Sequence, residues 1–277
     1  MKPNHVHHRH NYLKILAPVF AVMAVVVALA LGYRKLRSLY LEQAEIADYH
    51  AQVKIETGKM VRSAVLAEMF GLKKGANLAT LDFAAKRKEI LRRIPTLREI
   101  YITRALPGKV TIRAEERVPI VRLGIKGQRT ETGRVADEEG VVFLCQRGTQ
   151  MLPIIREVRA PGTALGQRLS ARAAAALRLV QAVREPEFSD LGLLEIDLSR
   201  QDFLLLTLGN YSKVKICWEG MDAELEPGET PSEEQTADML ARLRNLLKAM
   251  RSRISSDTRI WNATLPDRVF ADNQERK

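Results

Sequence analysis

The longest uninterrupted apolar segment of the chain lies near its N-terminus. Residues 15–32 (ILAPVFAVMAVVVALALG) are eighteen consecutive uncharged side chains, and Tyr33 follows them. As a helix, this segment would rise about 27 Å, close to the ~30 Å hydrocarbon core of a bilayer. The pattern predicts a transmembrane helix over residues 15–33, preceded by a cytoplasmic tail of residues 1–14.

Two features of this segment leave alternatives open. Ala28-Leu29-Ala30 fits the small-x-small cleavage site of a signal peptide, although apolar character continues through Leu31. The flanking basic residues, three on each side, give no preferred orientation. A short head before a long body favours an N-terminus in the cytoplasm. Both alternatives carry the bulk of the chain across the membrane.

The next part of the chain divides into a helical stalk, residues 34–50, and a compact unit, residues 51–118. Alternation of apolar and polar residues indicates strands, and apolar stripes at helical spacing indicate helices. The first expected element is a strand over 52–56. Two helices follow, one from the cap Ser63 to Gly71 and one from the cap Asp82 to Pro95. Strands over 97–105 and 109–117 are expected next, joined by a type II turn at 106–109. The predicted order is β-α-α-β-β.

Residues 119–272 are expected to form a second, β-rich domain with two helices, and residues 273–277 a tail. The helices are predicted over 169–185, capped by Ser170, and over 233–254, where Ser232 and Gln235 form a capping box. Short strands are expected at 119–126, 133–137, 140–145, 191–197, 203–208 and 213–218, with a closing extended stretch at 259–271. The predicted fold class is therefore α+β with a single N-terminal transmembrane helix.

Composition adds a basic balance to this pattern. The 277 residues include 44 Lys and Arg against 33 Asp and Glu, a net charge of +11. Residues 51–277 contribute 38 basic and 30 acidic side chains, or +8. Such a balance favours anionic neighbours, among them a membrane surface. Nucleic acid is not expected, because aromatic residues make up only 5% and supply no stacking platform.

The side chains that most enzymes need are scarce. Four of the five histidines lie within residues 5–10, and only His50 lies elsewhere, so nucleophile–histidine pairs have almost no candidates. No phosphate-binding glycine loop and no zinc-binding spacing occurs. Cys145 and Cys217 are expected to be reduced and buried rather than paired with each other. The sequence predicts no enzyme, no cofactor, no metal site and no small-molecule substrate.

Several motifs, taken in order, resemble the bacterial FtsQ/DivIB cell-division family. The best match is the junction between the two predicted domains, where RIPTLREI, RALPGKVTI and EERVPI follow one another. The matching segments are residues 75–82, 93–100, 104–112, 115–120, 135–143, 152–155 and 265–269. Residues 261–264 (WNAT) depart from the family pattern before the last strand, as does Thr96, where an aromatic residue is common. The resemblance implies a POTRA domain over 51–118 and an FtsQ-type β domain over 119–272.

The resemblance further implies a scaffold of the division septum. Members of this family are single-pass (type II) proteins of the cytoplasmic (inner) membrane, in contact with its lipid. Their extracytoplasmic part binds small coiled-coil division proteins of the FtsB/FtsL (DivIC) type and helps to control septal peptidoglycan synthesis. Partners bind through the last strand, which places the expected partner-binding residues here at Ala263, Thr264, Pro266, Arg268, Val269 and Phe270.

Two alternatives stay open at this stage. Residues 263–270 fit an ordinary closing strand with Val269 or Phe270 turned inward. A POTRA-containing, membrane-anchored periplasmic chaperone or secretion adaptor is the alternative function.

Overall fold

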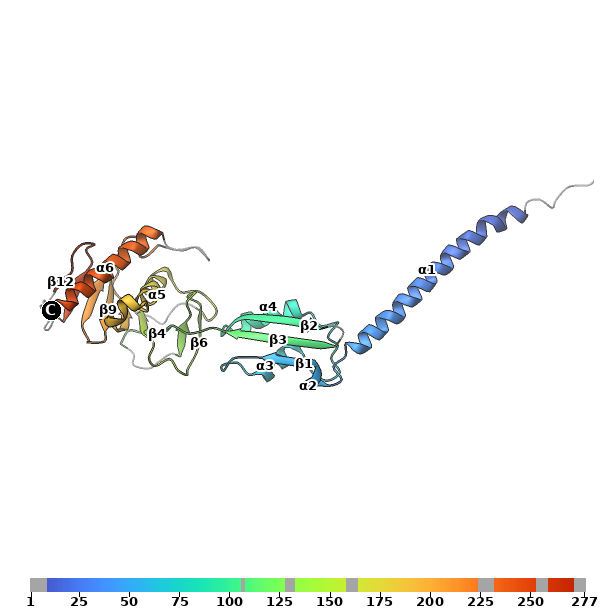
Figure 1. Cartoon of the computed structure of the whole chain (residues 1–277), viewed down its shortest axis with the longest axis horizontal. Helices are drawn as coiled ribbons and strands as arrows, with labels where there is room; N and C mark the ends of the chain where they lie inside the picture. The colour runs from blue at the N-terminus through green and yellow to red at the C-terminus, as the bar shows by residue number, and fades with distance from the viewer. Residues whose placement is uncertain are drawn as a thin grey trace, which may run out of the picture. The chain divides into compact units, whose positions relative to one another are not determined.

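The computed structural model of the chain describes residues 9–105, 108–127, 133–157, 164–223, 232–252 and 259–271, with side chains from residue 22 onward. The fold consists of two compact units (Figure 1). The first comprises the chain up to Thr57 together with Arg62–Glu89 and Ile100–Ala114. The second comprises Gly58–Val61, Ile90–Glu99 and the chain from Glu115.

Helix α1 (Arg9–Gln43) covers the predicted transmembrane segment. Within the described part of the chain, no helix has the length and apolar character needed to cross a membrane, so the predicted transmembrane helix over 15–33 is wrong. The side chains of residues 15–21 lie outside the described part. The fold class is mixed α/β with a large β-sheet.

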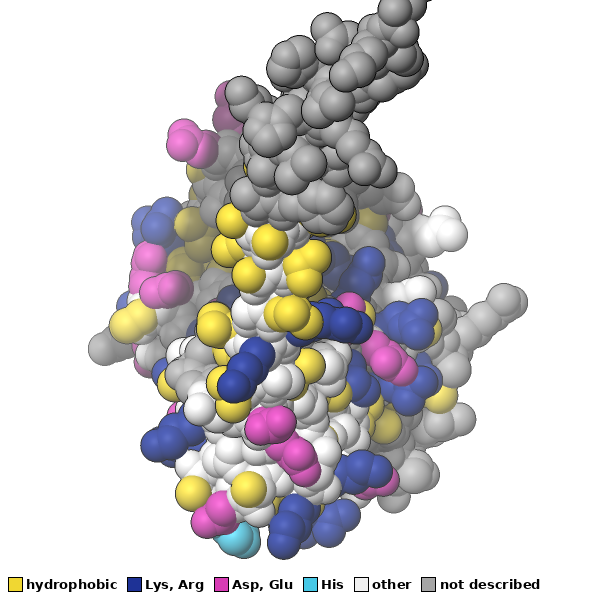
Figure 2. Space-filling view, turned by 90° about the vertical axis from the view of Figure 1, so that its right-hand side faces the viewer, with side chains coloured by type: hydrophobic (Ala, Val, Ile, Leu, Met, Phe, Trp, Pro, Cys, Tyr) yellow, Lys and Arg dark blue, Asp and Glu magenta, His cyan; other side chains and the backbone are white. Residues whose placement is uncertain are grey.

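The described side chains of this apolar run are open to solvent. Hydrophobic side chains gather along α1 on the face drawn in Figure 2, whereas Lys and Arg alternate with Asp and Glu elsewhere on that face. Val22 is 64% and Leu29 69% exposed.

The predicted helical stalk over 34–50 is wrong beyond Gln43. Helix α1 ends there, and a separate short helix, α2 (Tyr49–Gln52), is capped by the Asp48 side chain. Between them Ala44 and Ile46 are fully buried, and the N–H of Ile46 donates to the carbonyl of Ala76 at 2.9 Å. The chain leaves the helix because these tertiary hydrogen bonds and apolar contacts replace the intrahelical ones.

The smaller sheet has three strands, in the order β1-β3-β2. These are β1 (Val53–Glu56), β2 (Leu97–Ala105) and β3 (Lys109–Glu116), of which β1 and β3 are parallel. Helices α3 (Ser63–Phe70) and α4 (Phe83–Arg93) lie beside it (Figure 1). Gly71 ends α3 with φ of 75°, a conformation that glycine adopts without steric cost.

The predicted caps of these two helices differ in outcome. The Asp82 carboxylate accepts the Ala85 N–H at 3.0 Å, as expected for a capping residue. Ser63, by contrast, lies inside α3, because Arg62 is the N-cap residue and makes no side-chain capping bond. In the predicted turn at 106–109, residues 106–107 lie outside the described part of the chain.

The large sheet has nine strands, in the order β12-β11-β10-β9-β8-β7-β4-β5-β6. Five of its pairings are antiparallel, and β4–β7, β7–β8 and β10–β11 are parallel. The strands are β4 (Val121–Ile125), β5 (Arg134–Ala136), β6 (Val142–Leu144), β7 (Ile154–Glu157), β8 (Leu193–Asp197), β9 (Leu204–Leu208), β10 (Lys213–Ile216), β11 (Ile260–Ala263) and β12 (Phe270–Ala271). Strand β7 was not among the predicted strands.

Two helices and the sheet share one apolar core. The helices are α5 (Ala171–Val183) and α6 (Glu233–Arg251), and the 3-10 helix η1 (Pro186–Leu191) also contributes side chains to this core. The Ser170 and Ser232 hydroxyls accept N–H groups of the first turns of α5 and α6, which confirms both predicted caps. Burial alternates along β9 and β10, so every second side chain faces the helices.

A carboxylate near the start of the second unit holds a loop in place. The Glu116 side chain accepts the backbone N–H groups of Lys59, Met60 and Val61 at 2.7–3.1 Å. A Cβ on Gly58 would overlap this carboxylate, so glycine is required there while the hydrogen bonds are made. Three charge-assisted bonds to one side chain make Glu116 a principal support of residues 58–61.

Replacing Glu116 by Ala is expected to lower the free energy of unfolding by about 1–3 kcal/mol, because three N–H groups lose their acceptor. Urea unfolding followed by circular dichroism measures the change. The control is Glu138→Ala, which removes a 64% exposed side chain 3.6 Å from Arg98 and is expected to cost under about 0.5 kcal/mol. Equal losses in the two variants would contradict this role.

Candidate partner-binding edge of the large sheet

Strand β12 forms one edge of the nine-stranded sheet. It pairs antiparallel with β11, with Trp261 opposite Ala271 and Asn262 opposite Phe270. Among the described residues no strand lies on its other side. An edge strand presents backbone N–H and C=O groups that a further strand can pair with.

The opposite edge, β6, is covered by its own chain. The Val142 N–H donates to the carbonyl of Gln167 at 2.9 Å, and the Gly166 N–H donates to the carbonyl of Val142 at 2.7 Å. Val141 also forms an isolated bridge with Arg168. Residues 166–168 already use these backbone groups, so within the described part of the chain β12 is the more accessible of the two edges.

A buried ion pair on α6 fixes the segment that leads to β12. The Arg242 guanidinium is 7% exposed and meets the Asp238 carboxylate through two nitrogens, at 2.9 and 3.1 Å. The same guanidinium donates to the carbonyl of Thr264 at 2.5 Å and to that of Ala263 at 3.4 Å. The Arg242–Asp238 pair therefore joins helix α6 to the end of β11.

Neighbouring side chains complete this attachment. The Asn245 amide donates to the carbonyl of Pro266 at 3.1 Å, and the Cys217 thiol lies 3.6 Å from the carbonyl of Thr264. The Asn262 side-chain oxygen accepts both the N–H and the hydroxyl of Thr264. Burial raises the pKa of the Cys217 thiol, although the charge of Arg242 opposes this shift.

The six sequence-predicted site residues fall into three groups. Ala263 is fully buried, and the carbonyls of Thr264 and Pro266 are occupied by α6, so these three belong to the support of the edge. Val269 is half-buried and packs against the core, as the alternative of an inward-turned closing strand anticipates. Arg268 is exposed and Phe270 is 45% exposed. Among the six, Arg268, Phe270 and the ring of Pro266 are therefore the exposed side chains that a partner could contact.

Sequence reasoning missed Asp238, Arg242 and Asn245. They lie on the predicted helix whose apolar stripe was assigned to the core, and that assignment agrees with the burial of Met239, Leu243 and Leu246. The usable signal was an arginine inside the stripe with an acidic residue four positions before it. Nothing in the sequence indicated that its partners would be backbone carbonyls of residues 263 and 264.

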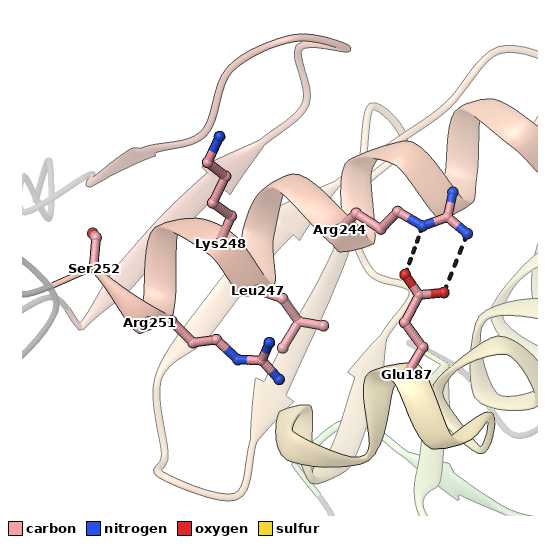
Figure 3. A pocket seen from close by; sticks show the side chains of 6 residues that line it. All are labelled: Glu187, Arg244, Leu247, Lys248, Arg251 and Ser252. Carbon is pink, nitrogen blue, oxygen red and sulfur yellow. Dashed lines mark hydrogen bonds and ion pairs between the residues drawn. The ribbon is translucent and has the colours of Figure 1, made fainter.

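A hollow lies between α6 and η1 (Figure 3). It has a volume of about 550 Å³ and is lined by Glu187, Arg244, Leu247, Lys248, Arg251 and Ser252. Arg244 meets the Glu187 carboxylate through two nitrogens, at 2.6 and 3.1 Å, and Arg251 pairs with Asp190. The hydrogen bond from Arg244 lowers the pKa of Glu187. Both carboxylates thus form ion pairs with arginines of α6.

The described residues contain no cluster of three or more His, Cys, Asp or Glu side chains that suits a metal ion. Cys145 and Cys217 are both free. No protein-family model matches the chain, and no curated protein matches it. The supported edge at β12 is the candidate functional site, since an edge strand can accept an added strand.

Replacing Arg242 by Met is expected to lower the free energy of unfolding by about 2–4 kcal/mol, because Asp238 loses its partner and two carbonyls lose a donor. Urea unfolding followed by tryptophan fluorescence is a suitable measurement, since Trp218 and Trp261 are both buried in this unit. Arg244→Met is the control on the same helix: its ion pair is exposed, and it is expected to cost under about 1 kcal/mol. A smaller loss for Arg242→Met than for the control would contradict the assigned role.

The Cys217 thiol is expected to be unreactive at neutral pH. In a Cys145→Ala background, alkylation by iodoacetamide should depend on pH with a midpoint above the ordinary thiol value of about 8.5. The same protein unfolded in urea provides the reference, with a midpoint near that ordinary value. A folded-state midpoint at or below the reference would contradict burial of the thiol against Thr264.

Proposed function

We propose that this chain is a non-enzymatic scaffold of the bacterial division machinery, with its two folded units outside the cytoplasm at the septum. The proposal combines the resemblance to the FtsQ/DivIB family with one structural observation, the accessible edge strand β12. The expected partners are small coiled-coil division proteins of the FtsB/FtsL (DivIC) type. Their binding would help to control septal peptidoglycan synthesis.

The mode of binding that this edge supports is strand addition. A partner segment in extended conformation pairs its backbone with β12 and extends the sheet beyond Phe270 and Ala271. Backbone pairing supplies affinity for any extended segment, so side chains beside the edge must select the partner. Phe270 offers an apolar surface, and Arg268 offers a charge that pairs with a carboxylate.

The support from α6 favours such a mode energetically. Carbonyl groups of residues 263, 264 and 266 are held by Arg242 and Asn245 before any partner arrives. A segment that is already ordered loses less conformational entropy on binding than a mobile one. The edge is thus prepared for a partner strand.

The test is Phe270→Asp, which places a charge where an apolar contact is expected. Pull-down of co-expressed FtsB- and FtsL-type proteins from the source organism should weaken at least about 10-fold, as for a central interface residue. The matched control is Leu144→Asp on the opposite edge, because Leu144 is 49% exposed and Phe270 45%. Unchanged recovery with Phe270→Asp, in a variant that unfolds as the wild type does, would contradict binding at β12.

A depletion experiment tests the cellular part of the proposal. Cells that lack the protein should grow as filaments, and a tagged copy that restores division should concentrate at midcell. Normal division with tagged protein spread evenly over the envelope would contradict a division role. That outcome would favour a periplasmic adaptor instead.

A further inference from the structure

The excess positive charge of the chain is concentrated in a short segment. Residues 59–93 contain nine Lys or Arg and three Asp or Glu, a net charge of +6. The whole of residues 51–277 carries +8. Helix α4 holds the densest part, with Lys86, Arg87, Lys88, Arg92 and Arg93 against the single acidic residue Glu89.

Two of these cations donate hydrogen bonds to backbone carbonyl groups, and Arg93 also has an interaction partner. The ammonium of Lys86 donates to the carbonyl of Met69 at 3.2 Å, and the guanidinium of Arg87 donates to the carbonyl of Ile100 at 2.8 Å. On the same side of the helix Phe83 and Ile90 are buried. This side of α4 is therefore occupied by packing and by internal hydrogen bonds.

Lys88 and Arg92 lie on the opposite, solvent-exposed side. Neither side chain makes a hydrogen bond or ion pair with any described residue. They are four residues apart, where like charges repel and destabilise a helix. The helix dipole accounts for basic residues in the last turn, such as Arg92, but not for Lys88 one turn earlier.

Helix α6 presents the same spacing with a different outcome. Arg244 and Lys248 are also four residues apart and exposed, but the carboxylate of Glu187 faces Arg244 (Figure 3). Asp190 faces Arg251 on the next turn. The chain supplies its own anions at α6, whereas among the described residues none pairs with Lys88 or Arg92.

We propose that the outward face of α4, centred on Lys88 and Arg92, binds the anionic headgroups of a phospholipid bilayer. Point charges on a convex helix attract a charged surface without requiring a shaped pocket. Phe83 and Ile90 on the apolar side of α4 are buried, so the helix lies on the headgroups and inserts no side chain between acyl chains. Nucleic acid fits this face less well, because the only aromatic residue of α4, Phe83, is buried and cannot stack on bases.

The test compares the full-length protein and its variants on vesicles of phosphatidylcholine alone and with 30% phosphatidylglycerol. Co-sedimentation should show preferential binding to the anionic vesicles, which 0.5 M salt removes. Lys88→Gln/Arg92→Gln should lower the partition coefficient onto the anionic vesicles about 30-fold, since each basic residue near an anionic surface contributes about 5-fold. The matched control, Arg244→Gln/Lys248→Gln, removes two cations at the same spacing and should change this partition coefficient less than 3-fold.

Three results would overturn the proposal. One is an equal loss for the two double variants, which would indicate attraction by overall charge alone. Another is unchanged binding of Lys88→Gln/Arg92→Gln. The third is competition in which a DNA duplex displaces the protein from anionic vesicles at an equal concentration of phosphate, which would assign the face to nucleic acid.

Discussion

The geometry of the candidate edge depends on one buried guanidinium. Between β11 and β12 the chain runs without a strand partner, so its carbonyl groups must find donors elsewhere. Arg242 supplies donors to residues 263 and 264, and Asp238 keeps this buried charge paired. The cost of burying a cation is offset because its carboxylate and both carbonyls lie within hydrogen-bond distance.

The sequence was sufficient where local rules decide structure. Alternating burial along β9 and β10, the caps Ser170 and Ser232 and the glycine that ends α3 all follow from patterns within a few residues. It failed where tertiary contacts decide. Helix α1 stops at Gln43 because residues 44–46 find partners at residues 76–78, and β7 is a four-residue strand with no alternation. The predicted membrane helix rests on the apolar length of residues 15–33 alone.

For the candidate site, the sequence and its family resemblance point to residues 263–270 as one binding strand. The structure divides this segment, because β11 ends at Ala263 and β12 begins at Phe270. The exposure of each side chain depends on where the chain turns, and the alternation of apolar and polar residues does not specify that position. The role of Arg242 escapes the sequence for a related reason. The function of an arginine within an apolar stripe can be assigned only when the carbonyl groups that it contacts are known.

The two edges of the large sheet express one constraint in different ways. An exposed strand edge invites unwanted pairing between copies, and proteins limit this risk with covers or with very short edge strands. Residues 166–168 cover β6, whereas within the described part of the chain no segment covers β12. Backbone pairing at an uncovered edge does not distinguish one extended strand from another. Specific association at β12 would therefore require side-chain contacts in addition, and Arg268 and Phe270 are exposed beside it. Discrimination between a partner and a second copy of the chain would rest on such side chains rather than on the backbone.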